Sequence, residues 1–249
     1  MAELSYQELL RYNRQINLKN FDIDKQQILK DSSVLMIGLG GLGCAAAPYL
    51  VTAGIGHLTL VDFDTVSVTN LQRQILHTDE TVGLLKVDSA ESALRKLNPY
   101  VEFSKINTML DDSDLKEQII KHDIVLDCCD NLATRLQLNQ LCYQTKTPLI
   151  SGAAIRMEGL LSTFLYQQDE PCYHCLSLLF GEEQLTCAEA GVMSPLVGMI
   201  GSMQAMEVIK VLTHYGQPLF GRLLTIDAIT MQFNELSLPK FPSCPVCSK

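Results

Sequence analysis

Side chains suited to a phosphorylated ligand gather in the first half of the chain, each group where an apolar stretch ends. The first group combines two carboxylates, one amide and two cations, namely Asp62, Asp64, Asn70, Arg73 and Lys86. The second follows an apolar stretch at 123–128 and consists of Cys128, Cys129, Asp130 and Asn131. A carboxylate such as that of Asp130 can hold Mg²⁺ through its oxygens. Together, these residue types suit a triphosphate better than the pyrophosphate of a dinucleotide.

Four of the nine cysteines form two C-x-x-C pairs, each beside a proline: Cys172, Cys175, Cys244 and Cys247. Four thiolate ligands that leave no open position are typical of structural zinc. The alternative is four unrelated buried cysteines. Cys187 stands apart among acidic residues and has no adjacent histidine, which disfavours a reactive thiolate. We therefore expect one zinc ion per chain and no reactive thiol at Cys187.

A glycine-rich turn must place a ligand close to the first group. Gly38, Gly40 and Gly43 have the spacing G-x-G-x-x-G between an apolar run and a helix-prone segment. Such a strand, turn and helix bring backbone N–H groups and the positive end of a helix dipole to a phosphate. A second strand at 57–62 completes a βαβ unit with Asp62 at its tip, where an acid accepts hydrogen bonds from ribose hydroxyls. The same turn can also serve close packing of helix on strand.

Helical and apolar stretches continue to alternate, which predicts a parallel sheet with helical connections. The expected helices are 83–97, 113–121 and 131–145, and the expected strands are 101–107, 123–128 and 148–154. After about residue 150, longer strands at 159–166 and 222–238 flank one long helix at about 195–213, so the sheet should continue antiparallel. We expect one α/β domain over 1–249, Rossmann-like and doubly wound. Its halves are a nucleotide-binding region, about 1–150, and a partner-binding region, about 151–249, with the zinc site.

Composition and charge exclude several classes of protein. The chain has 249 residues, 47% of them apolar, which is enough for a substantial core. Its formal charge of −9 argues against nucleic acid as the main partner. The apolar stretch 192–209 contains Pro195, Gln204 and Glu207, so it indicates a buried helix and not a membrane span. The first residues lack the pattern of a signal peptide, and we expect a cytoplasmic protein without a membrane partner.

Four motifs in this order resemble those of the ubiquitin-activating-type adenylyltransferases. They are G-x-G-G-x-G at 38–43, D-x-D-x-V-x-x-x-N-L-x-R-Q at 62–74, Lys86, and C-x-D-N at 128–131. The likeness extends over essentially the whole chain. It implies adenylation of the C-terminal glycine of a small ubiquitin-like sulfur carrier by Mg-ATP, with release of pyrophosphate. The likeness favours MoaD, the carrier subunit of molybdopterin synthase, over the thiamine carrier.

The resemblance also implies residue roles. The backbone of Gly41 and the carboxylate of Asp62 hold the nucleotide, and Asp130 carries Mg²⁺. Arg73 and Lys86 surround the phosphates, and Arg14 reaches them from the other subunit of a homodimer that binds two carriers. The implied catalytic residues are Arg14, Arg73, Lys86 and Asp130. The other implied nucleotide-binding residues are Thr69, Asn70, Leu71, Gln72, Cys128, Cys129 and Asn131.

Simpler structural roles compete with several of these assignments. Asp64 could cap a turn, and Asn70 and Gln72 could be turn or helix-cap residues. Asp130 and Asn131 could cap the next helix, which is compatible with metal binding. Arg14, three residues after Arg11, could belong to a solvated helix face.

Two other functions fit some of the pattern. The glycine turn and Asp62 also suggest an NAD-dependent oxidoreductase, which would explain neither the segment 70–73 nor the cysteine pairs. The second alternative function is that of a non-enzymatic scaffold, stabilised by zinc, that binds a carrier without activating it. The acidic and cationic residues near the glycine turn argue against the scaffold.

Overall fold

The computed structural model describes residues 3–180 and 190–248. Its strands are β1 Ser33–Ile37, β2 His57–Val61, β3 Glu102–Ile106, β4 Ile124–Asp127, β5 Leu149–Ile155, β6 Glu158–Phe164, β7 Arg222–Asp227 and β8 Gln232–Ser237. They form one eight-stranded sheet in the order β3-β2-β1-β4-β5-β6-β7-β8. Neighbours from β3 to β5 are parallel, and those from β5 to β8 are antiparallel. The expected α/β fold with an antiparallel continuation is confirmed.

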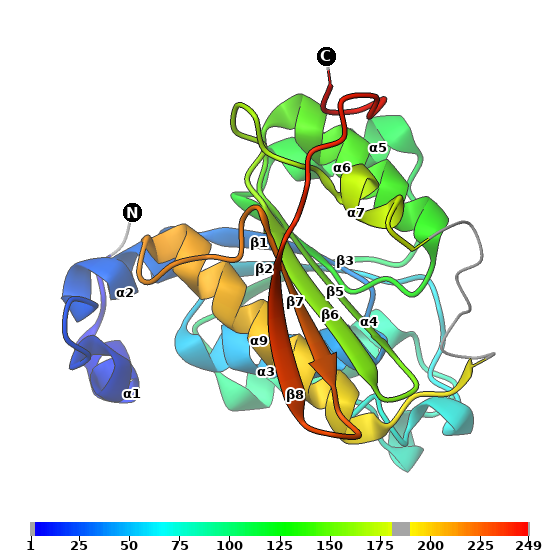
Figure 1. Ribbon diagram of the computed structural model, residues 1–249. Coiled ribbons are helices and arrows are strands. Elements are labelled where there is room, and N and C mark those ends of the chain that lie inside the picture. The colour runs from blue at the N-terminus through cyan, green and yellow to red at the C-terminus, as the bar shows by residue number, and fades with distance from the viewer. Residues whose placement is uncertain (1–2, 181–189, 249) are drawn as a thin grey trace.

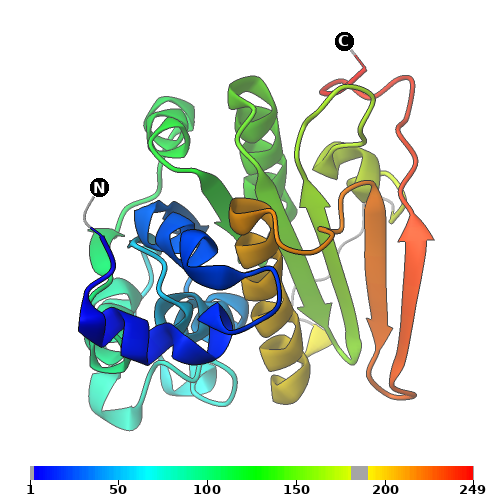
Figure 2. The same cartoon turned by 90° about the vertical axis from the view of Figure 1, so that its left-hand side faces the viewer.

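Helices cover both faces of this sheet (Figure 1). They are α1 Tyr6–Ile16, α2 Asp22–Asp31, α3 Gly41–Ala53, α4 Lys86–Leu97, α5 Asp112–Ile120, α6 Leu132–Thr145, α7 Tyr173–Ser177 and α9 Ser194–Thr213, with short 3₁₀ helices η1 Val68–Asn70 and η2 Asp79–Thr81. α3, α4 and α9 pack on one face, and α5, α6 and α7 on the other. Figure 2 shows α1 and α2, in blue, on the same side of the molecule as α9.

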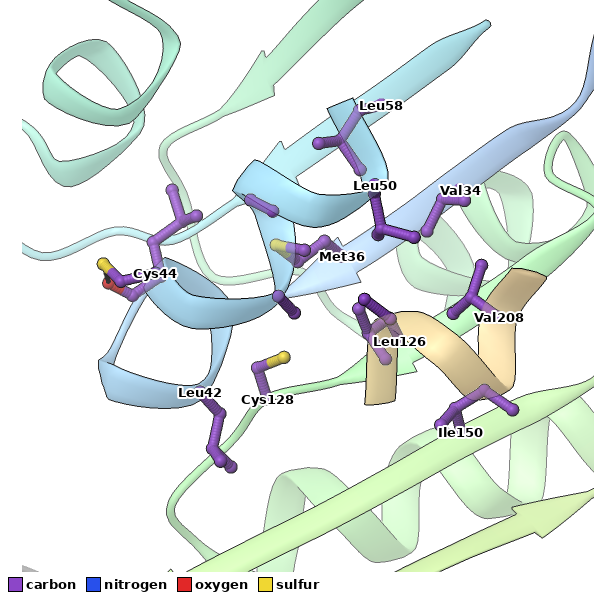
Figure 3. Packing of buried hydrophobic residues seen from close by; sticks show 14 of the residues in the cluster. Val34, Met36, Leu42, Cys44, Leu50, Leu58, Leu126, Cys128, Ile150 and Val208 are labelled. Atoms are coloured by element: carbon purple, nitrogen blue, oxygen red, sulfur yellow. Dashed lines mark hydrogen bonds between the residues drawn. The ribbon is translucent and has the colours of Figure 1, made fainter. Parts of the chain in front are cut away.

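The parallel half follows from apolar strands that are buried on both faces. Successive side chains of a strand point to opposite faces, so Met36 joins the core under α3 and α9, whereas Leu35 joins the core under α5 and α6. In Figure 3, Met36 and Leu126 lie close to Leu50 of α3 and Val208 of α9. This double burial explains why these strands are continuous apolar runs and do not alternate with polar residues.

The boundaries and the smallest elements differ from expectation. The helix expected from residue 83 begins at Lys86, and the stretch 222–238 divides into β7 and β8. Helix α7 was not predicted, since it has only five residues. It contains Cys175 and has Cys172 as its N-cap. This short helix is stabilised by contacts of the cysteine pair with residues far along the chain. It has no helical periodicity by which the sequence could reveal it.

Helix α9 is long and apolar enough to cross a membrane by length and composition, yet half of its apolar window is buried inside the molecule. It packs against α3, β5 and β6. Glu207, only 2% exposed, accepts hydrogen bonds from the Thr163 hydroxyl at 2.6 Å and the Leu219 N–H at 2.7 Å. It also pairs with Lys210. A buried acid held in this way belongs to a core helix, as the sequence predicted.

Replacing Glu207 with alanine should lower the free energy of unfolding by about 3 kcal/mol, because two buried donors then lose their acceptor. Glu207→Gln keeps an acceptor of the same size and should lose roughly half as much. Urea unfolding followed by circular dichroism measures both values. Equal losses in the two variants would contradict the hydrogen bonds assigned to this carboxylate.

Candidate functional site

A cleft of about 770 Å³ lies at the carboxyl ends of the parallel strands. β1 stands between β2 and β4, and the helices that follow β1 and β4 pack on opposite faces of the sheet. Ligands of open α/β sheets bind at such a switch point, and the volume is that of a small-molecule site. Residues of β5, β6 and α7 complete the cleft wall. Both halves of the chain therefore contribute to one site.

The glycine turn forms the floor of this cleft, and its geometry excludes side chains. Gly38 has φ +99°, and a Cβ there would lie 2.7 Å from the Cys128 carbonyl oxygen. A Cβ on Gly43 would lie 2.1 Å from the Gly38 carbonyl oxygen. Gly40 is the N-cap of α3 and provides no side-chain cap, so the first N–H groups of α3 are not capped by it. Uncapped N–H groups beside a cleft are suited to an anion such as a phosphate.

Asp62 follows β2 and is fixed by two backbone donors. Its Oδ2 accepts from the Leu39 N–H at 2.7 Å, and its Oδ1 accepts from the Asp64 N–H at 2.9 Å. The carboxylate therefore holds the glycine turn against the tip of β2. A carboxylate has about four acceptor positions, so Asp62 retains acceptor capacity for ribose hydroxyls on the cleft side.

Lys86 is the first residue of α4 and is only 5% exposed. Its Nζ donates to Asp64 Oδ2 at 2.7 Å and lies 3.9 Å from Asp62 Oδ2. The Lys86 N–H also donates to the Asp64 carbonyl oxygen at 3.0 Å. Asp64 is thus the ion-pair partner of Lys86. Two carboxylates hold this buried ammonium at the cleft.

The segment 68–74 contributes some of its expected residues to the cleft. Asn70 and Arg73 line the cleft, whereas Thr69, Leu71 and Gln72 do not. Asn70 Oδ1 also accepts from the Ser67 N–H at 3.2 Å, which is the capping role weighed from the sequence. Arg73 Nη1 donates to the Thr69 carbonyl oxygen at 3.1 Å. This bond places the guanidinium beside the turn.

The C-x-D-N motif lies beside the glycine turn, at the end of β4. Cys128, Cys129, Asp130 and Asn131 all line the cleft. Asn131 caps α6 by accepting from the Thr134 N–H at 2.9 Å, whereas Asp130 is exposed and can face a ligand. Burial raises the pKa of each of the thiols of Cys128 and Cys129 well above the ordinary value for cysteine, so both thiols stay protonated. Neither thiol is suited to act as a nucleophile.

A buried charge network behind Asp130 was missed from the sequence. Asp127 accepts from the Ser151 hydroxyl at 2.6 Å and from the Cys129 N–H at 3.0 Å. Its carboxylate lies 3.9 Å from Arg135 Nη1. Arg135 in turn donates to the carbonyl oxygens of Cys129 and Gly152. The available signal was an acid inside an apolar strand, which requires a buried cation nearby.

The four cysteines of the C-x-x-C pairs form a second cluster, all buried, with their sulfur atoms within 4.8 Å of one another. Two Sγ–Sγ distances are 3.7 Å, for Cys172 and Cys244, and 3.4 Å, for Cys175 and Cys247. A tetrahedral zinc site with Zn–S bonds of about 2.3 Å separates its sulfur atoms by about 3.8 Å. The arrangement therefore fits zinc.

Besides Thr69, Leu71 and Gln72, two further expected residues lie outside the cleft or outside the described chain. Arg14 is exposed near the end of α1 and does not line the cleft of its own chain. Cys187 falls outside the described residues.

Residues 12–246 match the ThiF family. The molybdopterin-synthase adenylyltransferase of Escherichia coli (strain K12) is 60% identical over 249 residues, which cover 100% of both chains. The Haemophilus influenzae protein of that name is 54% identical over 96% of this chain and 98% of its own. The adenylyltransferase and sulfurtransferase MOCS3 of Drosophila persimilis is 42% identical, over 99% of this chain and 55% of its own.

The solved structure of Escherichia coli MccB with ATP matches with a TM-score of 0.78 and 24% identity, over 90% of this chain and 68% of that chain. This likeness shows a shared fold. The full-length relatives confirm the expected class of enzyme, an adenylyltransferase, and favour the molybdopterin branch over the thiamine branch. The chain therefore belongs to the ThiF family, as its motifs predicted.

Proposed function

We propose that this chain adenylates the C-terminal glycine of the small sulfur-carrier subunit of molybdopterin synthase, MoaD. The reaction forms an acyl-adenylate and pyrophosphate from Mg-ATP, in molybdenum cofactor biosynthesis. The single observation that carries the proposal is the identity of 60%, over both full chains, to a molybdopterin-synthase adenylyltransferase. Adenylation of the thiamine carrier is the alternative within the family.

The chemistry sets a clear electrostatic requirement. A C-terminal carboxylate is already ionised at neutral pH, so it needs no general base to attack the α-phosphate. Its obstacle is repulsion, since two unit charges about 4 Å apart repel by about 4 kcal/mol at an effective dielectric of about 20. Arg73, Lys86 and the first N–H groups of α3 oppose this repulsion from the cleft floor. Asp62 receives the ribose.

The remaining nucleotide-binding residues act around these groups. Asn70 contacts the phosphates from the cleft wall, while Thr69, Leu71 and Gln72 build the turn that carries Asn70 and Arg73. Residues 128–131 line the cleft at the end of β4 and would face the nucleotide there.

Asp130 is the residue that would hold Mg²⁺. Its exposed carboxylate at the cleft fits a cation that otherwise keeps water and phosphate ligands. When bound, Mg²⁺ stabilises negative charge on the leaving pyrophosphate. Arg135 fixes the Cys129 carbonyl oxygen directly before Asp130 and so limits where this carboxylate can go.

The proposed assembly is a homodimer with two carriers. Arg14 is exposed on α1 and does not line the cleft of its own chain, and its charge would serve the cleft of the partner. Within each chain we assign the nucleotide to residues 1–150 and the carrier to residues 151–249. The cytoplasm is the proposed location, because the reaction consumes ATP and the eight described cysteines are all free thiols.

The proposed function is tested by exchange of labelled pyrophosphate into ATP. Purified MoaD should stimulate exchange more than the thiamine carrier does. Faster exchange with the thiamine carrier would reassign the substrate, and no exchange with either carrier would overturn adenylation.

Asp130→Ala should lower carrier-dependent exchange by at least roughly 10²–10³-fold, since it removes one preorganised charge contact and the metal ligand. The melting temperature should stay close to that of the wild type, because Asp130 is exposed. Exchange at the wild-type rate would remove Asp130 from the mechanism. Asp114→Ala is a matched control, since Asp114 is exposed and does not line the cleft.

Purified protein should contain one zinc ion per chain, held by Cys172, Cys175, Cys244 and Cys247. Because metal binding energy becomes folding energy, Cys244→Ser should lose the zinc and melt at a lower temperature. Elemental analysis and a thermal melt measure the two effects. Cys142→Ser, at a buried thiol outside the cluster, should keep the zinc. A wild-type protein without zinc would contradict the assignment.

Inactive Arg14→Ala and inactive Asp130→Ala chains should regain some of the exchange activity when mixed, because a heterodimer then contains one intact cleft. Random mixing of equal amounts predicts heterodimers as about half of the dimers, each with one active cleft of two. Mixtures that stay inactive after confirmed subunit exchange would show that Arg14 does not act across the dimer.

A further inference from the structure

Gln74, directly after Arg73, lines the cleft although it is only 3% exposed. Its Oε1 has no hydrogen-bond partner, and it is the one buried side-chain oxygen or nitrogen of which this is true within residues 3–180 and 190–248. A buried polar atom left unpaired destabilises the folded state. The unpaired oxygen of Gln74 therefore needs an explanation.

The other buried glutamines are bonded at their amide groups. Gln26 donates to the Ala53 carbonyl oxygen at 3.0 Å and accepts from Gln15. Gln204 donates to the Asp127 carbonyl oxygen at 2.7 Å. These amides join segments of the fold. Gln74 differs from them in leaving its amide oxygen unused by the described protein.

The amide of Gln74 reaches the glycine turn. A Cβ built on Gly40 would lie 3.9 Å from Gln74 Nε2, and Gly40 also lines the cleft as the N-cap of α3. The backbone of Gln74 is fixed on both sides, since its N–H donates to the Asn70 carbonyl oxygen and its carbonyl oxygen accepts from the His77 N–H, both at 3.0 Å. The side chain is therefore held beside the position where an anion meets the first N–H groups of α3.

We propose that Gln74 is a further nucleotide-binding residue, whose Nε2 donates to an oxygen of the phosphate at the Gly40–Gly41 turn. Phosphate oxygens only accept hydrogen bonds, so the amino end of the amide is the one that serves. The inference rests on the proposed function, because it takes a nucleotide polyphosphate as the ligand.

An uncharged donor supplements the cations at this point. Lys86 shares its charge with Asp62 and Asp64, whereas the amide of Gln74 carries no charge and needs no counter-ion. It orients a phosphate oxygen without altering the charge balance of the cleft floor. The unpaired Oε1 is the consequence of keeping this donor in place.

The test replaces Gln74 with methionine, which has a similar length and no polar amide. Without the unpaired oxygen, Gln74→Met should melt about 2–4 °C above the wild type. Without the donor, it should bind Mg-ATP about 10- to 100-fold more weakly by isothermal titration in the absence of carrier. Gln26→Met is the matched control and should melt lower than the wild type while its affinity for Mg-ATP stays the same.

Gln74→Glu separates the donor from the shape of the side chain. It keeps the size and adds a negative charge beside the phosphate, so it should weaken Mg-ATP binding more than methionine does. Unchanged affinity in Gln74→Met, or a melting temperature below that of the wild type, would overturn the inference. Wild-type protein that fails to bind Mg-ATP would overturn the proposed function as well, whereas a normal wild type with a normal Gln74→Met overturns the inference alone.

Discussion

The hydrogen bond from the Leu39 N–H to the Asp62 carboxylate is the contact on which the rest of the cleft depends. It joins the turn after β1 to the tip of β2. The same carboxylate also accepts a hydrogen bond from the Asp64 N–H. Asp64 then positions Lys86 through both its backbone and its side chain. One half-buried acid therefore sets the relative positions of the phosphate-binding turn and of the Lys86 ammonium.

The cations at the cleft are opposite in sign to the net charge of the whole chain. The formal net charge is −9, which repels a polyanionic nucleotide at long range. Within the cleft, Arg73 and the N–H groups at the start of α3 add to the charge of Lys86, which Asp62 and Asp64 share, while Asp127 and Arg135 neutralise one another behind it. Exposed charges separated by more than about 8 Å are largely screened at physiological salt. The local cations therefore determine binding more than the net charge does.

Much of this organisation could be predicted from the sequence, because it depends on local patterns. The order of strands and helices and the clustering of the cysteine pairs all follow from periodicity and spacing. Asp64 stayed ambiguous, since its partner Lys86 approaches only through tertiary structure. Arg135 was missed for the same reason, and its acceptors come from β5 and from the end of β4. Helix α7 was missed because contacts with a distant segment hold it in place.

The cysteine cluster has a consequence for the order of biosynthesis. Cys172 and Cys244 are 72 residues apart, and ribosomes add roughly 5–20 residues per second. For roughly 4–14 s after Cys172 is made, the partner thiols of the first pair do not yet exist. Tyr173 and Leu176 of the cleft wall lie in the same short helix as Cys175. A nascent chain thus completes its glycine turn early but acquires this wall of the cleft only near the end of synthesis, so a truncated product would carry an open cleft and two unprotected thiols.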